Sequence, residues 1–156
     1  MGVNSKLFKY VVNEESFPDK ALVIQEGNLG NWVYLLLEGK IKIQKNSPKG
    51  RLNLATLSPG AIFGELIFLQ MREGHRTATA VADGPVTLGV LDMELLSKEY
   101  RSVSPLLKVL ISNLARRLQE STEKLVSLAE TIPHRPARSK SARSRQDPSP
   151  GRQTRG

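Results

Sequence analysis

Short runs of β-forming residues, each ended by turn residues, occupy the chain from Phe17 to Leu91. Glycine and asparagine at the breaks favour tight turns, so the runs predict strands joined by short connections. Many short strands with corners at Gly27, Gly39 and Gly60 predict a mainly β fold, an antiparallel β-barrel or jelly roll. The expected strands are 21–25, 32–37, 40–44, 51–57, 76–82 and 85–91.

Helical spacing appears on both sides of this β region. Residues 1–16 carry apolar residues at helical intervals, which predicts a short amphipathic N-terminal helix. Asp92 is a suitable N-cap for a second short helix that runs to Tyr100. The apolar positions of the N-terminal segment are Val3, Leu7, Phe8, Val11 and Val12.

A long C-terminal helix is predicted over 104–132. Ser104 is a good N-cap, Pro105 suits the first helical position, and Pro133 ends the helix. Its apolar residues recur at steps of four and three, the rhythm of a coiled-coil seam, which predicts self-association through the second half. In the alternative the helix packs on its own barrel, and the first half is expected to do so. The seam is Leu107, Ile111, Leu114, Leu118, Ser121, Leu125 and Leu128, and the barrel contacts are Leu106, Val109 and Leu110.

One segment carries the chemistry of a binding site. Residues 63–69 read Phe-Gly-Glu-Leu-Ile-Phe-Leu, and residues 76–80 read Arg-Thr-Ala-Thr-Ala. Gly64 permits a close backbone approach, and the turn after Glu65 offers free N–H groups to an anion. Arg76 supplies a guanidinium that pairs well with such an anion. A carboxylate, an N–H cradle and a guanidinium together suit a ligand with both a hydroxyl and a phosphate.

These segments resemble the phosphate-binding cassette of cyclic nucleotide-binding domains, the family of the bacterial catabolite activator protein and the protein kinase A regulatory subunit. The resemblance implies that Glu65 accepts a hydrogen bond from the ribose 2′-hydroxyl and that Arg76 neutralises the cyclic phosphate. It also implies a phosphate cradle of Gly64 and the first helical N–H groups, with the Thr77 hydroxyl beside the phosphate or the purine. The implied ligand-binding residues are Phe63, Gly64, Glu65, Leu66, Ile67, Arg76, Thr77 and Ala78.

The resemblance spans about Phe17 to Tyr100 and sets the expected organisation of the chain. An N-terminal helical segment (1–16) precedes a cyclic nucleotide-binding barrel (17–100). The long helix (104–132) follows, covers the base and joins a dimer, as in relatives of the catabolite activator type. A residue near 114–118 is expected to touch the purine.

Two departures from the family pattern leave a second hypothesis open. Ile67 stands where the family usually has a small residue, and a β-branched side chain narrows the pocket. The step from Glu65 to Arg76 is 76 − 65 = 11 positions, a residue or two longer than expected. In this second hypothesis the cassette binds no ligand, and the barrel is an interaction module that dimerises through 105–132.

The net charge of +8 lies mostly in the last 24 residues, 133–156. Seven cations and one acid, Asp147, give that tail 7 − 1 = +6 and leave 8 − 6 = +2 for the rest. Proline, serine, arginine and glycine without large aliphatic residues predict a disordered tail. Such a tail suits loose contact with nucleic acid or anionic lipid, or no partner at all. No helix-turn-helix of the transcription-factor relatives is recognised.

Several other classes of function find no support in the sequence. Zero cysteines exclude disulfides and thiolate sites and favour the cytoplasm, and no stretch approaches the ~20 apolar residues of a membrane helix. His75 and His134 have no evident catalytic or metal partner, and no nucleophile or nucleotide-hydrolysis motif occurs, so no enzyme, metal site or cofactor is expected. The leading hypothesis is a cyclic nucleotide sensor that signals ligand occupancy through its C-terminal helix to a partner protein or to a second copy. The choice between cAMP and cGMP stays open.

Overall fold

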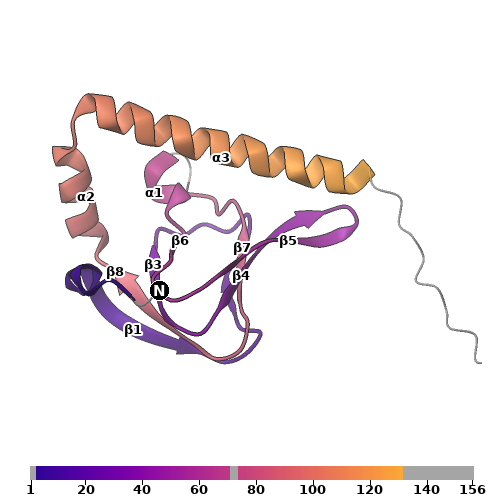
Figure 1. Ribbon diagram of the computed structural model, residues 1–156, viewed down its shortest axis with the longest axis horizontal. Coiled ribbons are helices and arrows are strands. Elements are labelled where there is room, and N and C mark those ends of the chain that lie inside the picture. The colour runs from indigo at the N-terminus through magenta and orange to yellow at the C-terminus, as the bar shows by residue number, and fades with distance from the viewer. Residues whose placement is uncertain (1–2, 71–73, 132–156) are drawn as a thin grey trace, which may run out of the picture.

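Two antiparallel four-stranded sheets form the body of the protein in the computed structural model, which describes residues 3–70 and 74–131 (Figure 1). The strand order is β1-β8-β3-β6 in one sheet and β2-β7-β4-β5 in the other. This arrangement confirms the predicted jelly roll. The strands are β1 (Val11–Phe17), β2 (Leu22–Ile24), β3 (Tyr34–Glu38), β4 (Ile41–Ser47), β5 (Gly50–Leu57), β6 (Ile62–Phe63), β7 (Thr79–Ala82) and β8 (Val86–Leu91).

The main core lies between the two sheets. Side chains of a strand point alternately to its two faces, so every second residue of β3 enters this core. Tyr34 and Leu36 lie in it, and the Tyr34 ring stacks on Phe63 at 5.4 Å between centroids. Burial of such side chains is the main stabilising contribution to a barrel of this size. The other buried members are Ile24, Ile41, Ala80, Ala82, Val86, Leu88 and Val90.

A second, smaller cluster lies on the opposite face of β3. Val33, Leu35 and Leu91 are buried there, so this part of the sheet is covered on both faces. The residues packed against this cluster come from the N-terminal segment, from the two short α-helices and, for Leu37, from β3 itself. They are Val3, Leu7, Tyr10, Val11, Leu37, Phe68, Met93 and Leu96.

The N-terminal segment differs from its prediction. Of its described residues, 3–16, only Ser5–Tyr10 is helical, as a 3₁₀ helix (η1), and the following residues form β1. β1 pairs with β8 from Val11↔Leu91 to Phe17↔Val86. The prediction of a helix over 1–16 is therefore wrong beyond Tyr10, because pairing with β8 satisfies the backbone groups that a helix would otherwise bond internally.

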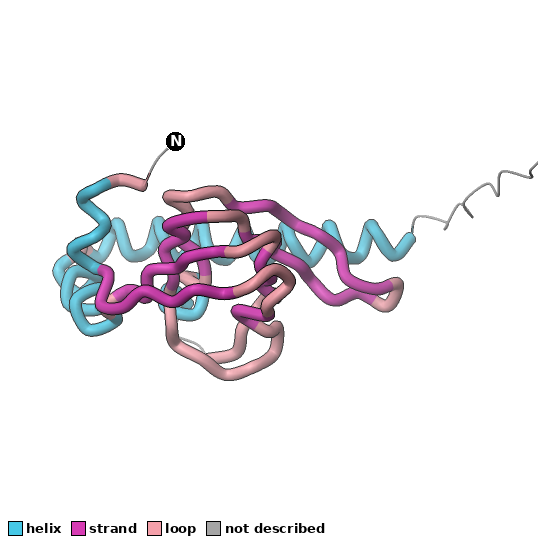
Figure 2. The backbone as a smooth tube through the Cα atoms, turned by 90° about the horizontal axis from the view of Figure 1, so that it is seen from below, coloured by secondary structure: helices cyan, strands magenta, loops and turns pink. Residues whose placement is uncertain are grey.

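Three α-helices complete the described residues: α1 (Leu66–Gln70), α2 (Met93–Ser102) and α3 (Pro105–Thr131). The Asp92 side chain accepts hydrogen bonds from the N–H groups of Glu94 and Leu95, which confirms the predicted N-cap. The Ser104 hydroxyl accepts from the Leu107 N–H at 3.4 Å, at the start of α3. α3 runs along the barrel beside the β4–β5 hairpin (Figure 2), and Lys49 of that hairpin bonds to the Glu130 carbonyl.

Within the described ranges no helix has both the length and the apolar character needed to cross a bilayer. The predicted disordered tail, 133–156, lies outside the described residues, as do positions 71–73 of the loop before Arg76.

Candidate functional site

Arg76 lies just before β7 and is buried, with 8% of the residue exposed. Its Nη1 donates to the Gly64 carbonyl at 3.2 Å, and its Nη2 donates to the Trp32 carbonyl at 2.7 Å. Among the described residues, no carboxylate forms an ion pair with it. Burial lowers the pKa of Arg76 below its ordinary value, and Tyr34 opposes part of that shift, but a guanidinium keeps its proton. A buried cation with donors to spare is a receptor for an anion.

Two glycines make room for this guanidinium. A Cβ on Gly64 would lie 2.9 Å from Arg76 Nη1 and 3.0 Å from the Trp32 carbonyl oxygen. A Cβ on Gly30 would lie 3.2 Å from both Nε and Nη2 of Arg76. Gly64 also has φ +81°, in the left-handed region that residues with a side chain rarely adopt. The predicted close approach at Gly64 is therefore an approach to Arg76.

Glu65 directly precedes α1, and the carbonyl of Glu65 accepts from the Leu69 N–H at 3.0 Å. Leu66 and Ile67 form the first turn of α1, where backbone N–H groups have no partner inside the helix. Glu65 and Arg76 line the same cavity of about 350 Å³. This volume is within the range of small-molecule sites, roughly 300–1,000 Å³.

All eight predicted site residues line this cavity, Ile67 included. Their roles toward a ligand stay predictions. Much of the remaining wall is apolar and comes from β4, β5 and α3. The remaining lining residues are Ile24, Ile43, Lys45, Leu54, Ala55, Leu57, Ile62, Thr79, Ala80, Leu118, Gln119, Thr122, Glu123 and Leu125.

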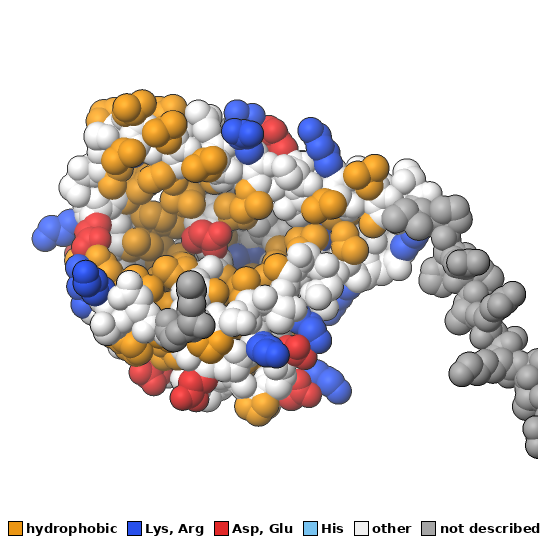
Figure 3. Space-filling view, viewed as in Figure 1, with side chains coloured by type: hydrophobic (Ala, Val, Ile, Leu, Met, Phe, Trp, Pro, Cys, Tyr) orange, Lys and Arg blue, Asp and Glu red, His pale blue; other side chains and the backbone are white. Residues whose placement is uncertain are grey.

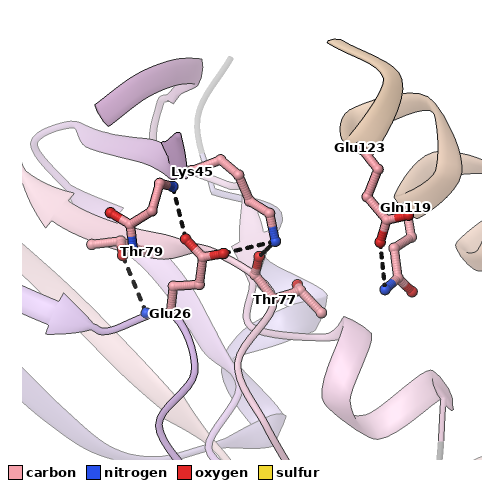
Figure 4. Close-up of polar contacts among 7 residues, drawn as sticks. Glu26, Lys45, Thr77, Thr79, Gln119 and Glu123 are labelled. Atoms are coloured by element: carbon pink, nitrogen blue, oxygen red, sulfur yellow. Dashed lines mark hydrogen bonds and ion pairs between the residues drawn. The ribbon is translucent and has the colours of Figure 1, made fainter. Parts of the chain in front are cut away.

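An ion pair that sequence reasoning missed lies at the cavity wall (Figure 4). Lys45 Nζ lies 2.8 Å from Glu26 Oε1 and donates to the Thr77 carbonyl at 2.6 Å. The other Glu26 oxygen accepts from the Asn46 N–H at 2.8 Å, and the Glu26 N–H donates to Thr79 Oγ1 at 3.1 Å. Both charged side chains are only 19% exposed, so these contacts fix the ammonium group in place.

The sequence contains one indication that Lys45 is partly buried and paired. Alternation along β4 puts Lys45 on the face of Ile41 and Ile43, which the pattern predicts to be inward. A charged residue at an inward position needs a partner. Glu26 is that partner, but it comes from the turn after β2, so its proximity follows from the tertiary structure.

The α3 helix forms one side of the cavity through residues 118–125. Leu118 lies there as expected, whereas Leu114 is 64% exposed and does not line the cavity. The predicted packing of the first half of α3 on the barrel is wrong. Its three expected contact residues are exposed, and Figure 1 shows the early turns of α3 next to α2, with the strands further away. These residues are Leu106 (69%), Val109 (57%) and Leu110 (49%).

A second cavity, about 750 Å³ and more open, lies between α1, α2 and the sheet. Figure 3 shows a hollow beneath the helices in which hydrophobic side chains predominate. Glu65 borders both cavities. The other lining residues of the second cavity are Val33, Ile62, Phe68, Leu69, Leu91, Leu96, Glu99, Tyr100, Ser102 and Val103.

Known proteins share this architecture and parts of this sequence. A CRP-like cAMP-activated global transcriptional regulator of Mycobacterium tuberculosis is 33% identical over 124 residues, which cover 78% of this chain and 54% of the regulator. The solved Thermus thermophilus catabolite activator protein is 34% identical with a TM-score of 0.55, over 75% of this chain and 55% of that chain. The regulatory domain of Toxoplasma gondii PKA, solved with cAMP, is 24% identical with a TM-score of 0.52, over 67% and 38% of the two chains, a likeness of fold alone.

The chain spans about half the length of the two bacterial relatives it matches. The family model described as "Cyclic nucleotide-binding domain" matches residues 14–102, which is 102 − 14 + 1 = 89 of the 156 residues. That range contains the whole cassette and all eight strands except the first residues of β1. The match of more than half the chain, with the jelly roll and the cavity at the cassette, shows that this protein belongs to the cyclic nucleotide-binding domain family.

Proposed function

We propose that this protein is a sensor that binds cAMP or cGMP in the cavity between the barrel and α3. The observation that carries the proposal is the buried Arg76, which lines the cavity without an acid partner among the described residues. A cyclic phosphate would supply the missing negative charge, and a guanidinium holds phosphate oxygens well. Glu65, on the same cavity, would accept a hydrogen bond from the ribose 2′-hydroxyl. The Mycobacterium tuberculosis relative, described as cAMP-activated, supports a ligand of this class.

The composition of the cavity walls supports the transmission of ligand occupancy through α3. The cassette provides one side and residues 118–125 of α3 provide another, so a ligand in the cavity would contact both. A ligand shifts a conformational equilibrium only through a difference in its affinity for the two arrangements. Contacts with both the cassette and α3 would provide that difference, and nucleotide binding would favour the arrangement in which α3 closes the cavity.

Isothermal titration of the whole chain tests the binding directly. We expect saturable heat with cAMP, cGMP or both, at one nucleotide per chain. Adenosine and guanosine are the matched controls, because they lack the phosphate that Arg76 would hold, and they should give no saturable heat. No binding of either cyclic nucleotide would overturn the proposed function and leave the ligand-free interaction module as the better account.

A ridge of exposed leucines on α3 favours a second copy of the chain as a partner. This holds whether the protein is a nucleotide sensor or a ligand-free interaction module. Leu107, Leu114, Leu118, Leu125 and Leu128 of the predicted seam are 51–64% exposed. Ala115 is the one buried residue of α3, so within the described structure little of this helix is covered. Parallel ridges at heptad spacing associate by inserting side chains of one helix between those of its partner. We therefore infer a homodimer through 105–132.

Light scattering on the whole chain checks this dimer. We expect the wild type at twice the mass of one chain and the double variant Leu114→Glu/Leu128→Glu at the mass of one, because buried charges oppose association. Neither leucine lines the nucleotide cavity. Asn113→Glu/Ser127→Glu makes the same charge change beside the seam and should stay dimeric. A wild type that is monomeric at all concentrations, or seam variants that stay dimeric, would contradict the dimer.

A further inference from the structure

We propose that Lys45 selects the purine base of the ligand and makes the cavity prefer guanine to adenine. This inference rests on the proposed function and deepens it. Four charged side chains line the cavity: Lys45, Glu65, Arg76 and Glu123. Glu65 and Arg76 are assigned to the sugar and the phosphate, so Lys45 and Glu123 remain for the base.

The places assigned to the phosphate and the sugar leave one part of the cavity for the purine base. With the phosphate at Arg76 and the sugar at Glu65, most of the other lining residues belong to the β4–β5 surface and to α3. That surface is apolar at Ile43 and Leu54, which suits the faces of a purine ring. Lys45 is the cation within it. A base placed there would have its ring against apolar side chains and one edge toward the ammonium group.

Lys45 is held more firmly than Glu123. Its side chain is 19% exposed and is fixed by Glu26 at 2.8 Å and by the Thr77 carbonyl at 2.6 Å. Glu123 lies in an exposed position on α3 and accepts from Gln119 at 3.2 Å. Figure 4 shows Lys45 and Thr77 on the barrel side, with Gln119 and Glu123 across from them. A group held in place before the ligand arrives loses little freedom on binding, so its contacts contribute more to affinity.

The donors of Lys45 set the preference. An ammonium group has three N–H donors and no acceptor. Two are used, by Glu26 and by the Thr77 carbonyl, which leaves one for the cavity within the described structure. Guanine presents two acceptors on one edge, O6 and N7, whereas adenine presents the acceptor N7 beside the donor N6 amino group. A lone donor therefore finds an acceptor at both positions of the guanine edge, whereas on adenine it can bond only to N7 and lies beside an amino group that also donates.

Titration with three cyclic nucleotides tests the preference. Cyclic IMP has the O6 and N7 of cyclic GMP but lacks its 2-amino group, so it isolates the edge that Lys45 would contact. We expect the wild type to bind cGMP and cIMP about tenfold more tightly than cAMP, as one hydrogen bond to a charged group allows. Lys45→Met should lower the affinity for cGMP and cIMP about tenfold and change the affinity for cAMP by less than about twofold. Lys45→Arg, which retains a cationic donor, should keep the preference.

Two further variants control for structural effects. Lys42→Met removes a lysine of the same strand that pairs with Asp83 at 2.8 Å and does not line the cavity, so it should leave all three affinities unchanged. Glu26→Gln/Lys45→Met removes both charges of the cavity pair and should lose the preference as Lys45→Met does. This double variant shows whether an unpaired Glu26, rather than the lost donor, changes the affinities.

Each contrary outcome identifies what has failed. If Lys45→Met weakens the binding of all three nucleotides equally, Lys45 only holds the backbone at Thr77 in place, which overturns the inference. A wild-type preference for cGMP that cIMP does not share would assign selection to the 2-amino group instead of Lys45. Tight binding of cAMP and cGMP without a preference also overturns the inference but leaves the proposed function intact. A wild type that binds none of the three refutes both.

Discussion

Arg76→Ala should weaken cyclic nucleotide binding by at least about 100-fold, or about 2.7 kcal/mol. The substitution removes the only buried cation at the cassette end of the cavity, among the described residues, and with it the bidentate hydrogen bonds that a guanidinium gives a phosphate. Isothermal titration measures the loss. Arg76→Lys should recover part of the affinity, because lysine restores the charge without the planar pair of donors.

The same substitution also has a structural cost that must be separated from the binding loss. Arg76 donates to the Gly64 and Trp32 carbonyls, so Arg76→Ala leaves both acceptors without these bonds. Thermal unfolding and circular dichroism of the variant show whether the barrel is still folded. Arg51→Ala, on an exposed position of β5, is the matched control and should bind as the wild type does. A folded Arg76→Ala variant that binds with wild-type affinity would refute the assigned role of Arg76.

Gly39→Ala should destabilise the fold by about 2–4 kcal/mol, from left-handed strain plus overpacking. Gly39 lies between β3 and β4 at φ +86°, where a residue with a side chain is strained. A Cβ there would lie 2.3 Å from the Pro85 carbonyl oxygen and 2.8 Å from Val86 Cγ1. The carbonyl belongs to the chain just before β8, in the middle of its sheet, so it has little freedom to move. Urea unfolding of the wild type and the variant measures the difference in the free energy of unfolding, provided that both have the same m value.

Gly84→Ala separates the two causes of that loss. Gly84 has nearly the same φ, +84°, but no heavy atom lies within 4 Å of a Cβ placed on it. Gly84→Ala should therefore lower the free energy of unfolding by only about 1 kcal/mol, which is the contribution of the backbone strain alone. If Gly39→Ala proves no more destabilising than Gly84→Ala, the contact with Pro85 relaxes freely and the packing explanation is wrong.

The cassette segment was recognisable in the sequence because most of its residues are near neighbours in the chain. Gly64, Glu65 and the first turn of α1 are consecutive, so their geometry follows from one turn and one helix start. Arg76 is separated from Glu65 by eleven positions, and the predicted strands bring both to one cavity. The N-caps at Asp92 and Ser104 were predictable for the same reason, since each cap contacts residues two or three positions ahead.

Two errors in the predicted elements arise where a segment pairs with a distant part of the chain. Val11 and Val12 have helical spacing with Leu7, yet they lie in β1 because β8 offers a free edge. The strand β6, which has only two residues, was not predicted, because so short a strand exists only through its pairing with Tyr34 and Leu35.

The sequence alone determined the mainly β fold, the long C-terminal helix and the cassette, because these depend on periodicity, turns and contacts between near neighbours. Only the tertiary structure decided which turns of α3 close the cavity and that Glu26 pairs with Lys45. The physical reason is the distance along the chain. Local preferences are encoded residue by residue, whereas a contact between remote segments depends on how every intervening element packs.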